Sequence, residues 1–261
     1  MSTACDTSLK SPVIVSLVDG VLNVTLNDEA GRNVLSVALM HAFKDALDRA
    51  ASDTAVRVVL VTNVGGVFCA GADLKAAPDE STADLFVELL RQIQTLPKPT
   101  IARITGHALG GGVGLAAAFD ISIASEGSKF GFTEVRLGVV PAVISAICLP
   151  KMRRGDAMEA FLRGNRFDAR RAAELGIVTR AVPLDAIDAE IGAIVDDVTL
   201  GGPHALAMAK QIIEEVPQMT PVDALHAMAA LSANVFASPE ARAGTEAFKQ
   251  RRSPPWVKRE T

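Results

Sequence analysis

The chain has little cysteine, no long apolar run and no excess of positive charge. Its three cysteines (Cys5, Cys69 and Cys148) are too few, and odd in number, for a disulfide framework, which favours a reducing cytoplasm. Charged side chains interrupt every apolar run before it reaches the roughly 20 residues of a membrane helix, and the polar first ten residues do not resemble a signal peptide. The net charge of −4 argues against nucleic-acid binding, which needs clustered Lys and Arg. We therefore expect a soluble, cytoplasmic protein that binds neither nucleic acid nor a membrane.

The apolar pattern predicts an α/β protein. Two β-branched runs at 13–18 and 21–26 flank Asp19-Gly20, which predicts a hairpin with a primed turn. Further strands are expected at 56–62, 100–104 and 121–124, and helices at 36–50 and 83–96. After residue 156 the pattern is almost wholly helical, with helices expected at 156–162, 168–175, 184–200, 204–215, 221–236 and 239–251. Alternating strands and helices imply right-handed crossovers, followed by a helical C-terminal part.

Two glycine-rich segments follow predicted strands. The first is F-C-A-G-A-D-L-K at 68–75, and the second is G-H-A-L-G-G-G-V-G-L at 106–115, which opens a helix of small residues. Glycines at the start of a helix leave backbone N–H groups accessible, and the helix dipole adds positive potential there. Such a site suits a developing negative charge. A tight turn with a close helix–sheet contact explains either segment alone equally well. The spacing and order do not match a dinucleotide-binding fingerprint.

Taken together, the two segments resemble the signatures of the crotonase (enoyl-CoA hydratase/isomerase) superfamily. The first resembles A-G-A-D-[LI]-K. The block K-P-T-I-A-R-I-T-G-H-A-L-G-G-G, which continues to F-D-I, resembles the second signature, and F-G-F-T-E-V-R-L-G-V-V-P follows at the expected distance. The likeness runs from about residue 21, through an L-N…N-x-L region, to the C-terminal A-F-K-Q-R-R.

The resemblance implies a spiral of β-β-α turns with a helical C-terminal region that packs trimers, commonly paired into hexamers. On this basis residues 1–200 form the acyl-CoA-binding core and 201–261 the region for oligomer packing. The family binds acyl-CoA thioesters, and its oxyanion hole of two backbone N–H groups falls on Ala72 and Gly111. Preorganised amides aimed at an enolate oxygen are worth about 3–4 kcal/mol in comparable sites. No cofactor is expected, because coenzyme A is part of the substrate.

The same resemblance implies further substrate contacts. Lys75 matches the residue near the CoA adenine and phosphates, while Phe248 and Arg251 match C-terminal positions that reach a neighbouring subunit's CoA. A surface basic cluster with one packing aromatic explains these three equally well. The remaining substrate-binding candidates in the signatures are Ala70, Asp73, Leu74 and Gly110.

The acid–base inventory departs from the family pattern. Hydratases of this family use one glutamate in G-G-G-x-E and one in F-G-x-x-E, so that one carboxylate activates water while the other handles the α-proton. Here Glu134 occupies the second position, but Gly114 stands at the first and cannot transfer protons. An ion pair with Arg136 is the alternative role for Glu134. Simple packing against small neighbours is the alternative for Gly114.

Other groups are weaker candidates for the missing acid. Asp73 and Asp120 are expected to be structural, Cys69 to be a small buried residue, and His107 to line the CoA channel or the surface. The other histidines, His41, His204 and His226, fit ordinary helix positions, and no metal-ligand spacing is present.

The segment after Pro141 also departs from the family, since A-V-I-S replaces a glycine-rich turn. Its β-branched residues should narrow the acyl end of the pocket. Ser145 is a candidate to hold water or a polar substrate group, although a helix N-cap is the role favoured for it.

Three hypotheses follow from these residues. The protein is an acyl-CoA enzyme of fatty-acid or related metabolism that shifts a double bond with one carboxylate, or it hydrates enoyl-CoA with water held in another way. The alternative is an acyl-CoA-binding protein with weak or no turnover.

Overall fold

The computed structural model describes residues 11–75 and 80–257, so Cys5 lies outside the described part. Strands β1 (Val13–Val18) and β2 (Val21–Leu26) form the expected antiparallel hairpin. Asp19 and Gly20 have φ values of 51° and 83°, and a type I′ turn requires positive φ at both central residues. The prediction of a primed turn is therefore confirmed.

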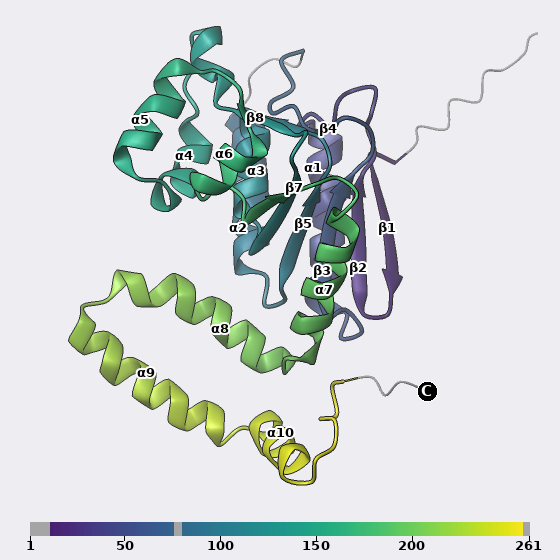
Figure 1. Ribbon diagram of the computed structural model, residues 1–261, viewed down its shortest axis with the longest axis vertical. Helices are drawn as coiled ribbons and strands as arrows, with labels where there is room; N and C mark the ends of the chain where they lie inside the picture. The colour runs from purple at the N-terminus through teal and green to yellow at the C-terminus, as the bar shows by residue number, and fades with distance from the viewer. Residues whose placement is uncertain (1–10, 76–79, 258–261) are drawn as a thin grey trace, which may run out of the picture.

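A six-stranded sheet forms the centre of the molecule (Figure 1), in the order β1-β2-β3-β5-β7-β10. Apart from the antiparallel edge strand β1, neighbouring strands are parallel. The remaining strands of this sheet are β3 (Val58–Asn63), β5 (Thr100–Ile104), β7 (Ile121–Ser125) and β10 (Arg180–Val182).

A second sheet of short strands was not predicted. It has the order β4-β6-β8-β9, made of β4 (Val67–Cys69), β6 (His107–Leu109), β8 (Lys129–Gly131) and β9 (Phe167–Asp168). Strands β4, β6 and β8 directly follow β3, β5 and β7, so each pass of the chain adds one strand to each sheet. This arrangement is the spiral of β-β-α turns that the resemblance implies.

Helices cover both faces of the large sheet. On one side lie α1 (Val37–Ser52), α2 (Glu80–Thr95) and α3 (Gly111–Ala118), whose buried apolar residues join Val59 and Val61 of β3. On the other side Ile187 and Ile191 of α7 (Ile187–Leu200) pack against Val58. Alternate residues of β3 thus face opposite layers, which confirms the prediction of a strand covered on both faces.

The chain after β8 is less purely helical than predicted. It forms a 3-10 turn at Thr133–Leu137, then α4 (Ala142–Cys148), a second 3-10 turn at Leu149–Lys151, α5 (Arg154–Arg163) and α6 (Ala169–Glu174). Strands β9 and β10 interrupt the helices, because two- or three-residue strands leave no periodic signal. Among residues 11–75 and 80–257, no helix is both long and apolar enough to cross a bilayer.

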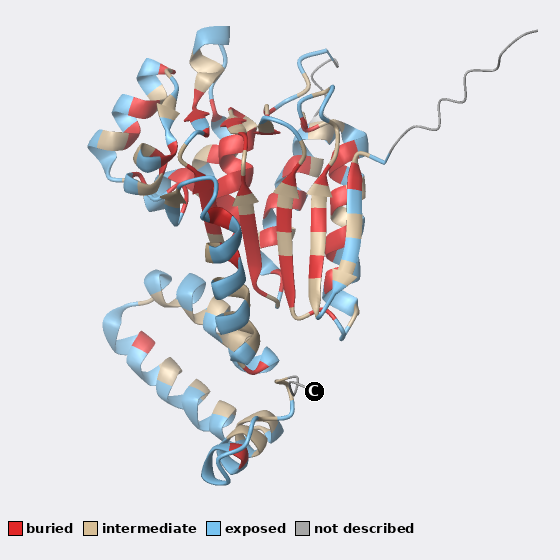
Figure 2. Cartoon of the chain, turned by 45° about the vertical axis from the view of Figure 1, so that its right-hand side comes forward, coloured by how far each residue is buried: buried red, intermediate tan, exposed pale blue. Residues whose placement is uncertain are grey.

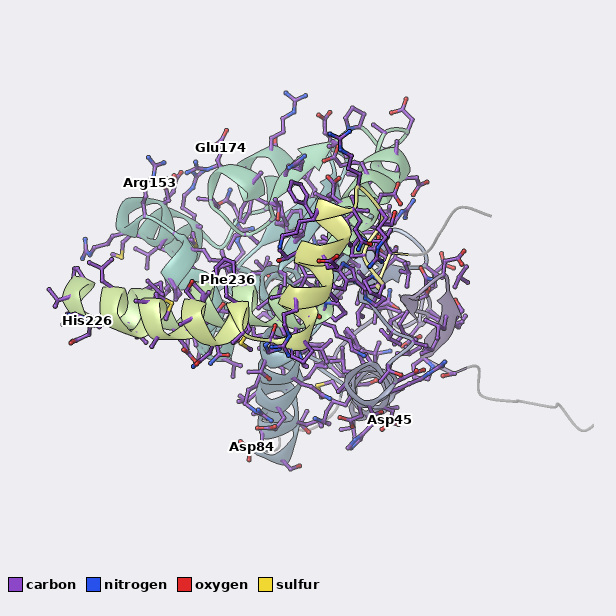
Figure 3. All side chains as sticks on the ribbon, turned by 90° about the horizontal axis from the view of Figure 1, so that it is seen from below. Asp45, Asp84, Arg153, Glu174, His226 and Phe236 are labelled. Carbon is purple, nitrogen blue, oxygen red and sulfur yellow. The ribbon has the colours of Figure 1, made fainter. Side chains whose placement is uncertain are left out.

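The last three helices form an arm that extends below the core (Figures 1 and 2). They are α8 (Pro203–Glu215), α9 (Pro221–Phe236) and α10 (Pro239–Lys249), with a 3-10 turn at Val216–Gln218 between the first two. Seen from below, α9 runs along the underside between the labelled His226 and Phe236 (Figure 3). Large apolar side chains are exposed on this C-terminal arm: Ile213, Val222, Leu225, Phe236 and Phe248.

Candidate active site

The structure brings the two glycine-rich segments into direct contact. Gly71 has a φ of +87°, and a Cβ added to it would lie 2.7 Å from the carbonyl oxygen of Leu109 and 3.0 Å from the amide nitrogen of Gly111. A Cβ at Gly112 would lie 2.2 Å from the carbonyl oxygen of Cys69. Only glycine permits these approaches. The interpretation of both segments as tight turns in close contact is therefore correct, and it is compatible with a role of the same loops in binding an anion.

The amides of Ala72 and Gly111 are the groups predicted to bind an oxyanion. Gly111 is the first residue of α3, where backbone N–H groups have no partner within the helix. Within the described residues, neither amide donates a backbone hydrogen bond. Both amides therefore have the hydrogen-bonding capacity that a bound anion requires, and the N-terminus of α3 adds positive potential at Gly111.

The N-x-L region supports the first loop and one wall of the site. Asn33 is fully buried and donates from Nδ2 to the carbonyl oxygen of Val67, at 2.8 Å. The Leu35 amide donates to the carbonyl oxygen of Gly71, also at 2.8 Å. A Cβ at Gly111 would lie 2.8 Å from Leu35 Cδ1 and 3.6 Å from Phe86 Cε1. Sequence reasoning missed Leu35 as a wall of the site, although its motif belongs to the family likeness.

Glu134 lies on the other side of the glycine triplet. It belongs to the 3-10 turn at Thr133–Leu137, and a Cβ at Gly110 would lie 3.3 Å from its Oε1 and 3.8 Å from its Oε2. Its Oε2 is buried without a hydrogen-bond partner among the described residues. Burial raises the pKa of the carboxyl, opposed by a hydrogen bond with its own backbone amide. The site therefore places a partly desolvated carboxyl beside the glycine loop.

The alternative role of Glu134 as an ion-pair partner is wrong. In the described part of the chain Arg136 donates to the carbonyl oxygen of Arg163, at 3.4 Å, and forms no ion pair with Glu134. A buried carboxylate without a countercharge is costly for folding, and such perturbed groups concentrate at functional sites.

Gly114 lies in the middle of α3 and is buried. Its nearest neighbour outside its own helix is Ile144 of α4, whose side chain lies directly over it. The small residues of α3 are therefore only part of the reason for a glycine at this position.

The predicted N-cap role of Ser145 is wrong. Helix α4 begins at Ala142 with Pro141 at its N-cap, so Ser145 is the fourth residue of the helix. Its hydroxyl donates to the carbonyl oxygen of Ala142, at 2.6 Å. With Pro141 as its N-cap, the helix starts four residues earlier than a Ser145 cap would require.

The remaining residues of the first signature surround the loop. The Asp73 carboxylate accepts a hydrogen bond from the Lys75 amide at 3.0 Å, which agrees with its predicted structural role. Leu74 and Lys75 are exposed. Ala70 donates its amide to the carbonyl oxygen of Arg32 at 3.2 Å.

Phe248 and Arg251 lie far from these loops. Phe248 lies in the last turn of α10, and 83% of its surface is accessible. Arg251 lies just after the helix and has a φ of 51°. Figure 1 shows α10 at the opposite end of the molecule from β4 and β8. These two residues therefore do not join the candidate site of their own chain.

Three of the weaker candidates for the missing acid are protonated or already hydrogen-bonded. Cys69 is buried, and burial raises the pKa of its thiol to about 12, which leaves it protonated at neutral pH. His107 accepts a hydrogen bond from the Lys129 amide at 3.1 Å. Asp120 is structural: its Oδ2 accepts from the Thr100 amide and contacts Lys210 Nζ, both at 2.7 Å.

The three remaining histidines, His41, His204 and His226, lie in α1, α8 and α9 as expected. No group of three or more His, Cys, Asp or Glu side chains in the described ranges could hold a metal ion.

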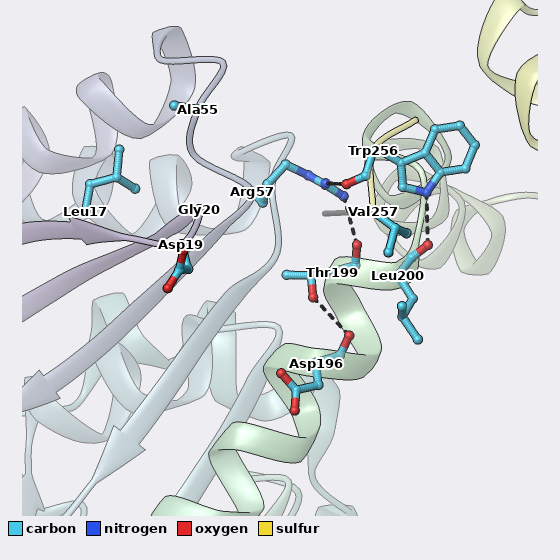
Figure 4. A pocket seen from close by; sticks show the side chains of 10 residues that line it. All are labelled: Leu17, Asp19, Gly20, Ala55, Arg57, Asp196, Thr199, Leu200, Trp256 and Val257. Atoms are coloured by element: carbon cyan, nitrogen blue, oxygen red, sulfur yellow. Dashed lines mark hydrogen bonds between the residues drawn. The ribbon is translucent and has the colours of Figure 1, made fainter. Parts of the chain in front are cut away.

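A separate pocket of about 820 Å³ lies where the arm joins the core (Figure 4). Arg57 donates to the carbonyl oxygens of Trp256 and Gly201, both at 2.7 Å, and of Thr199 at 3.3 Å. The Trp256 indole donates to the carbonyl oxygen of Leu200 at 3.0 Å. Burial lowers the pKa of the Arg57 guanidinium, and the Glu240 carboxylate opposes this change. These hydrogen bonds hold the C-terminal segment around Trp256 against the end of α7.

The chain is similar to known proteins in both sequence and fold. The family model described as enoyl-CoA hydratase/isomerase matches residues 17–259. An enoyl-CoA hydratase of Mycobacterium tuberculosis is 32% identical over 243 residues, covering 89% of this chain and 91% of that protein. The 2,3-dehydroadipyl-CoA hydratase of Escherichia coli is 31% identical over 249 residues, covering 94% and 98%.

A solved structure gives the same result for the fold. The crystal structure of an enoyl-CoA hydratase from Mycobacterium smegmatis superimposes with a TM-score of 0.88 at 29% identity, covering 94% of this chain and 98% of that one. The range matched by the family model includes both glycine loops and the whole C-terminal arm. The chain therefore belongs to the enoyl-CoA hydratase/isomerase family, the crotonase superfamily.

Proposed function

We propose that this enzyme shifts the double bond of an enoyl-CoA thioester, with Glu134 as its only proton-transferring carboxyl. Enoyl-CoA thioesters are suggested as substrates by the names of the relatives. The observation that carries the choice of reaction is the occupancy of the two family glutamate positions. Glu134 lies beside Gly110, whereas Gly114 has no side chain and is covered by Ile144.

The oxyanion hole supplies the main stabilisation in this proposal. The thioester oxygen of a 3-enoyl-CoA accepts hydrogen bonds from the Ala72 and Gly111 amides. The Glu134 carboxylate removes a proton from C2, and the electron pair is delocalised over the dienolate and the thioester oxygen. The two amides stabilise this charge, and loss of one such donor typically costs about 3–4 kcal/mol.

The same carboxyl completes the reaction. Protonated Glu134 returns the proton to C4, the double bond settles between C2 and C3, and the carboxylate is regenerated. One group therefore serves as base and then as acid. Burial favours the neutral form of Glu134, which helps the carboxyl to hold the proton between the two transfers.

Hydration is the second candidate, favoured by the names of the relatives. It would need a water molecule held without a second carboxylate. Binding without turnover is the third outcome. The deciding experiment supplies purified protein with a panel of 3-enoyl-CoA and 2-enoyl-CoA chain lengths.

The proposal is supported if the wild type converts 3-enoyl-CoA to 2-enoyl-CoA and the Glu134→Gln variant does not. Loss of the enoyl thioester absorbance from 2-enoyl-CoA, without isomerisation, would replace it by hydration. Tight binding of acyl-CoA with no turnover across the panel would replace it by the binding role.

The proposal extends to a homotrimer or a hexamer. The exposed apolar residues of the C-terminal arm need a partner surface. Phe248 and Arg251 lie too far from their own site to contact CoA there, so they are assigned to the CoA of a neighbouring copy. Lys75 and Leu74, exposed beside the first loop, are assigned to the CoA of their own chain. Light scattering coupled to size-exclusion chromatography measures the assembly.

A further inference from the structure

Helices α3 and α4 meet at a contact that only glycine allows. A Cβ built on Gly114 would lie 2.1 Å from Ile144 Cγ2 and 2.5 Å from Ile144 Cβ. Real carbon atoms do not approach so closely without a shift of the backbone. The Cγ2 methyl of Ile144 therefore occupies the space in which any side chain at position 114 would begin.

The same face of α4 lies near Glu134. Ile144 and Cys148, one helical turn apart, are the buried residues of α4. Glu134 Oε1 lies 3.3 Å from a Cβ built on Gly110, the N-cap of α3, and Gly114, which contacts Ile144, follows about one helical turn later. The contact between Gly114 and Ile144 therefore lies where a glutamate of the G-G-G-x-E motif would project.

We propose that Ile144 is a specificity-determining residue that excludes a second acid, and the water it would hold, from the site. Gly114 and Ile144 act as a matched pair: the missing side chain of one makes room for the side chain of the other. An apolar methyl group then faces the region where hydration requires a hydrogen-bonding partner for water. This inference rests on the proposed role of Glu134, and it explains why one-carboxyl proton transfer is favoured over hydration.

The geometry determines which substitutions can restore a second acid. Gly114→Glu alone places its Cβ against Cγ2 of Ile144. With Ile144→Ala the remaining Cβ still stands 2.5 Å away, whereas with Ile144→Gly the nearest atom of residue 144 is its Cα at 3.4 Å, an ordinary contact. Gly114→Glu with Ile144→Gly is therefore the test variant, and Gly114→Glu with Ile144→Ala is its matched control.

The experiment measures hydration of 2-enoyl-CoA, isomerisation of 3-enoyl-CoA and the thermal midpoint. The proteins compared are the wild type, the single variants Gly114→Glu and Ile144→Gly, and the two double variants. We expect the test variant to gain hydration by about 100-fold over the wild type, the lower end of what a positioned general acid–base contributes. The control pair and Gly114→Glu alone should gain no hydration. Both should melt at lower temperature than the test variant.

A gain by Gly114→Glu alone that equals the gain of the test variant would overturn the proposal, because Ile144 would then exclude nothing. A folded test variant without any gain would overturn it too. If the test variant does not fold, Gly114→Ala decides the question. Gly114→Ala should lower the thermal midpoint by about 2–10 °C when it is introduced into the wild type. It should lower the thermal midpoint much less when it is introduced into Ile144→Gly. Equal losses in the two proteins would refute the steric pairing of Gly114 with Ile144.

Failure of the proposed function gives a different pattern. If the wild type isomerises nothing, or if Glu134→Gln keeps the activity, the proposed reaction fails. The gain of hydration in the test variant and its absence in the alanine control still report on Ile144 independently.

Discussion

Gly71→Ala perturbs the proposed oxyanion hole without changing any titratable group. The φ of Gly71 is +87°, a region of the backbone map that costs an L-residue about 1–2 kcal/mol. The new Cβ would stand 2.7 Å from the Leu109 carbonyl oxygen and 3.0 Å from the Gly111 amide nitrogen. Both neighbours are backbone atoms that cannot rotate away, so the loop that carries the Gly111 amide must move.

Two separate effects follow from this displacement. Overpacking of this kind costs about 1–3 kcal/mol, so together with the strained φ the free energy of unfolding should fall by about 2–5 kcal/mol. Misalignment of one oxyanion donor should lower kcat by about 100- to 1000-fold. The second effect is specific to the oxyanion hole, because Gly71 lies outside the proton-transfer path.

Gly127→Ala is the matched control. A Cβ there meets no atom within 4 Å, and its φ is outside the left-handed region. Turnover of enoyl-CoA is measured well below the thermal midpoint of each variant, and the midpoint is measured separately. If folded Gly71→Ala turned over substrate as fast as Gly127→Ala, the placement of the oxyanion hole at these loops would be refuted.

Three further changes test other parts of the structure. Burial raises the pKa of Glu134 in the folded protein, so the stabilisation from this carboxyl is present below its ordinary pKa of 4.5 and is lost as pH rises through the folded pKa. Glu134→Gln should therefore raise the thermal midpoint at neutral pH, and this difference should vanish below about pH 4. A difference in thermal midpoint that does not depend on pH would contradict this prediction. Arg57→Lys should lower the unfolding free energy by about 2–3 kcal/mol, because two separate guanidinium nitrogens bind the three carbonyl oxygens and a single ammonium nitrogen cannot occupy both positions. Arg49→Lys on the exposed side of α1 should change it by less than about 0.5 kcal/mol, and equal effects in denaturant titrations would argue against the Arg57 cluster. Leu225 and Phe236 are 74% and 75% exposed in the single chain and are proposed to lie in the interface between copies. Leu225→Glu and Phe236→Glu place charges there, so light scattering should show smaller assemblies. An unchanged mass would show that these residues do not lie in the interface.

The long elements could be predicted from the sequence because their signals are local. The predicted range of α9 matches the structure, since Thr220 caps it by accepting from the Asp223 amide and Pro221 occupies its first turn. Strand β5 also matches its predicted range, because Pro99 and the following glycine delimit one apolar run. The short strands of the second sheet gave no periodic signal, although they position both glycine loops.

The site was predictable only in part. The two glycine segments were expected to act together, and the structure places them in contact. The β-branched residues after Pro141 were expected to narrow the pocket. That Ile144 covers Gly114 could not be predicted, because the packing of two short helices depends on the angle at which they meet rather than on either pattern.

The most direct test of the central claim is exchange of the α-protons of a saturated acyl-CoA with solvent deuterium, followed by nuclear magnetic resonance. Exchange needs only a base at C2 and stabilisation of the enolate oxygen, and it does not depend on which enoyl reaction follows. With a panel that includes butanoyl-CoA and octanoyl-CoA, the wild type should exchange α-protons of at least one thioester and Glu134→Gln should lose the exchange. Equal exchange by both proteins, or turnover of an enoyl-CoA by a wild type that exchanges none, would contradict the account.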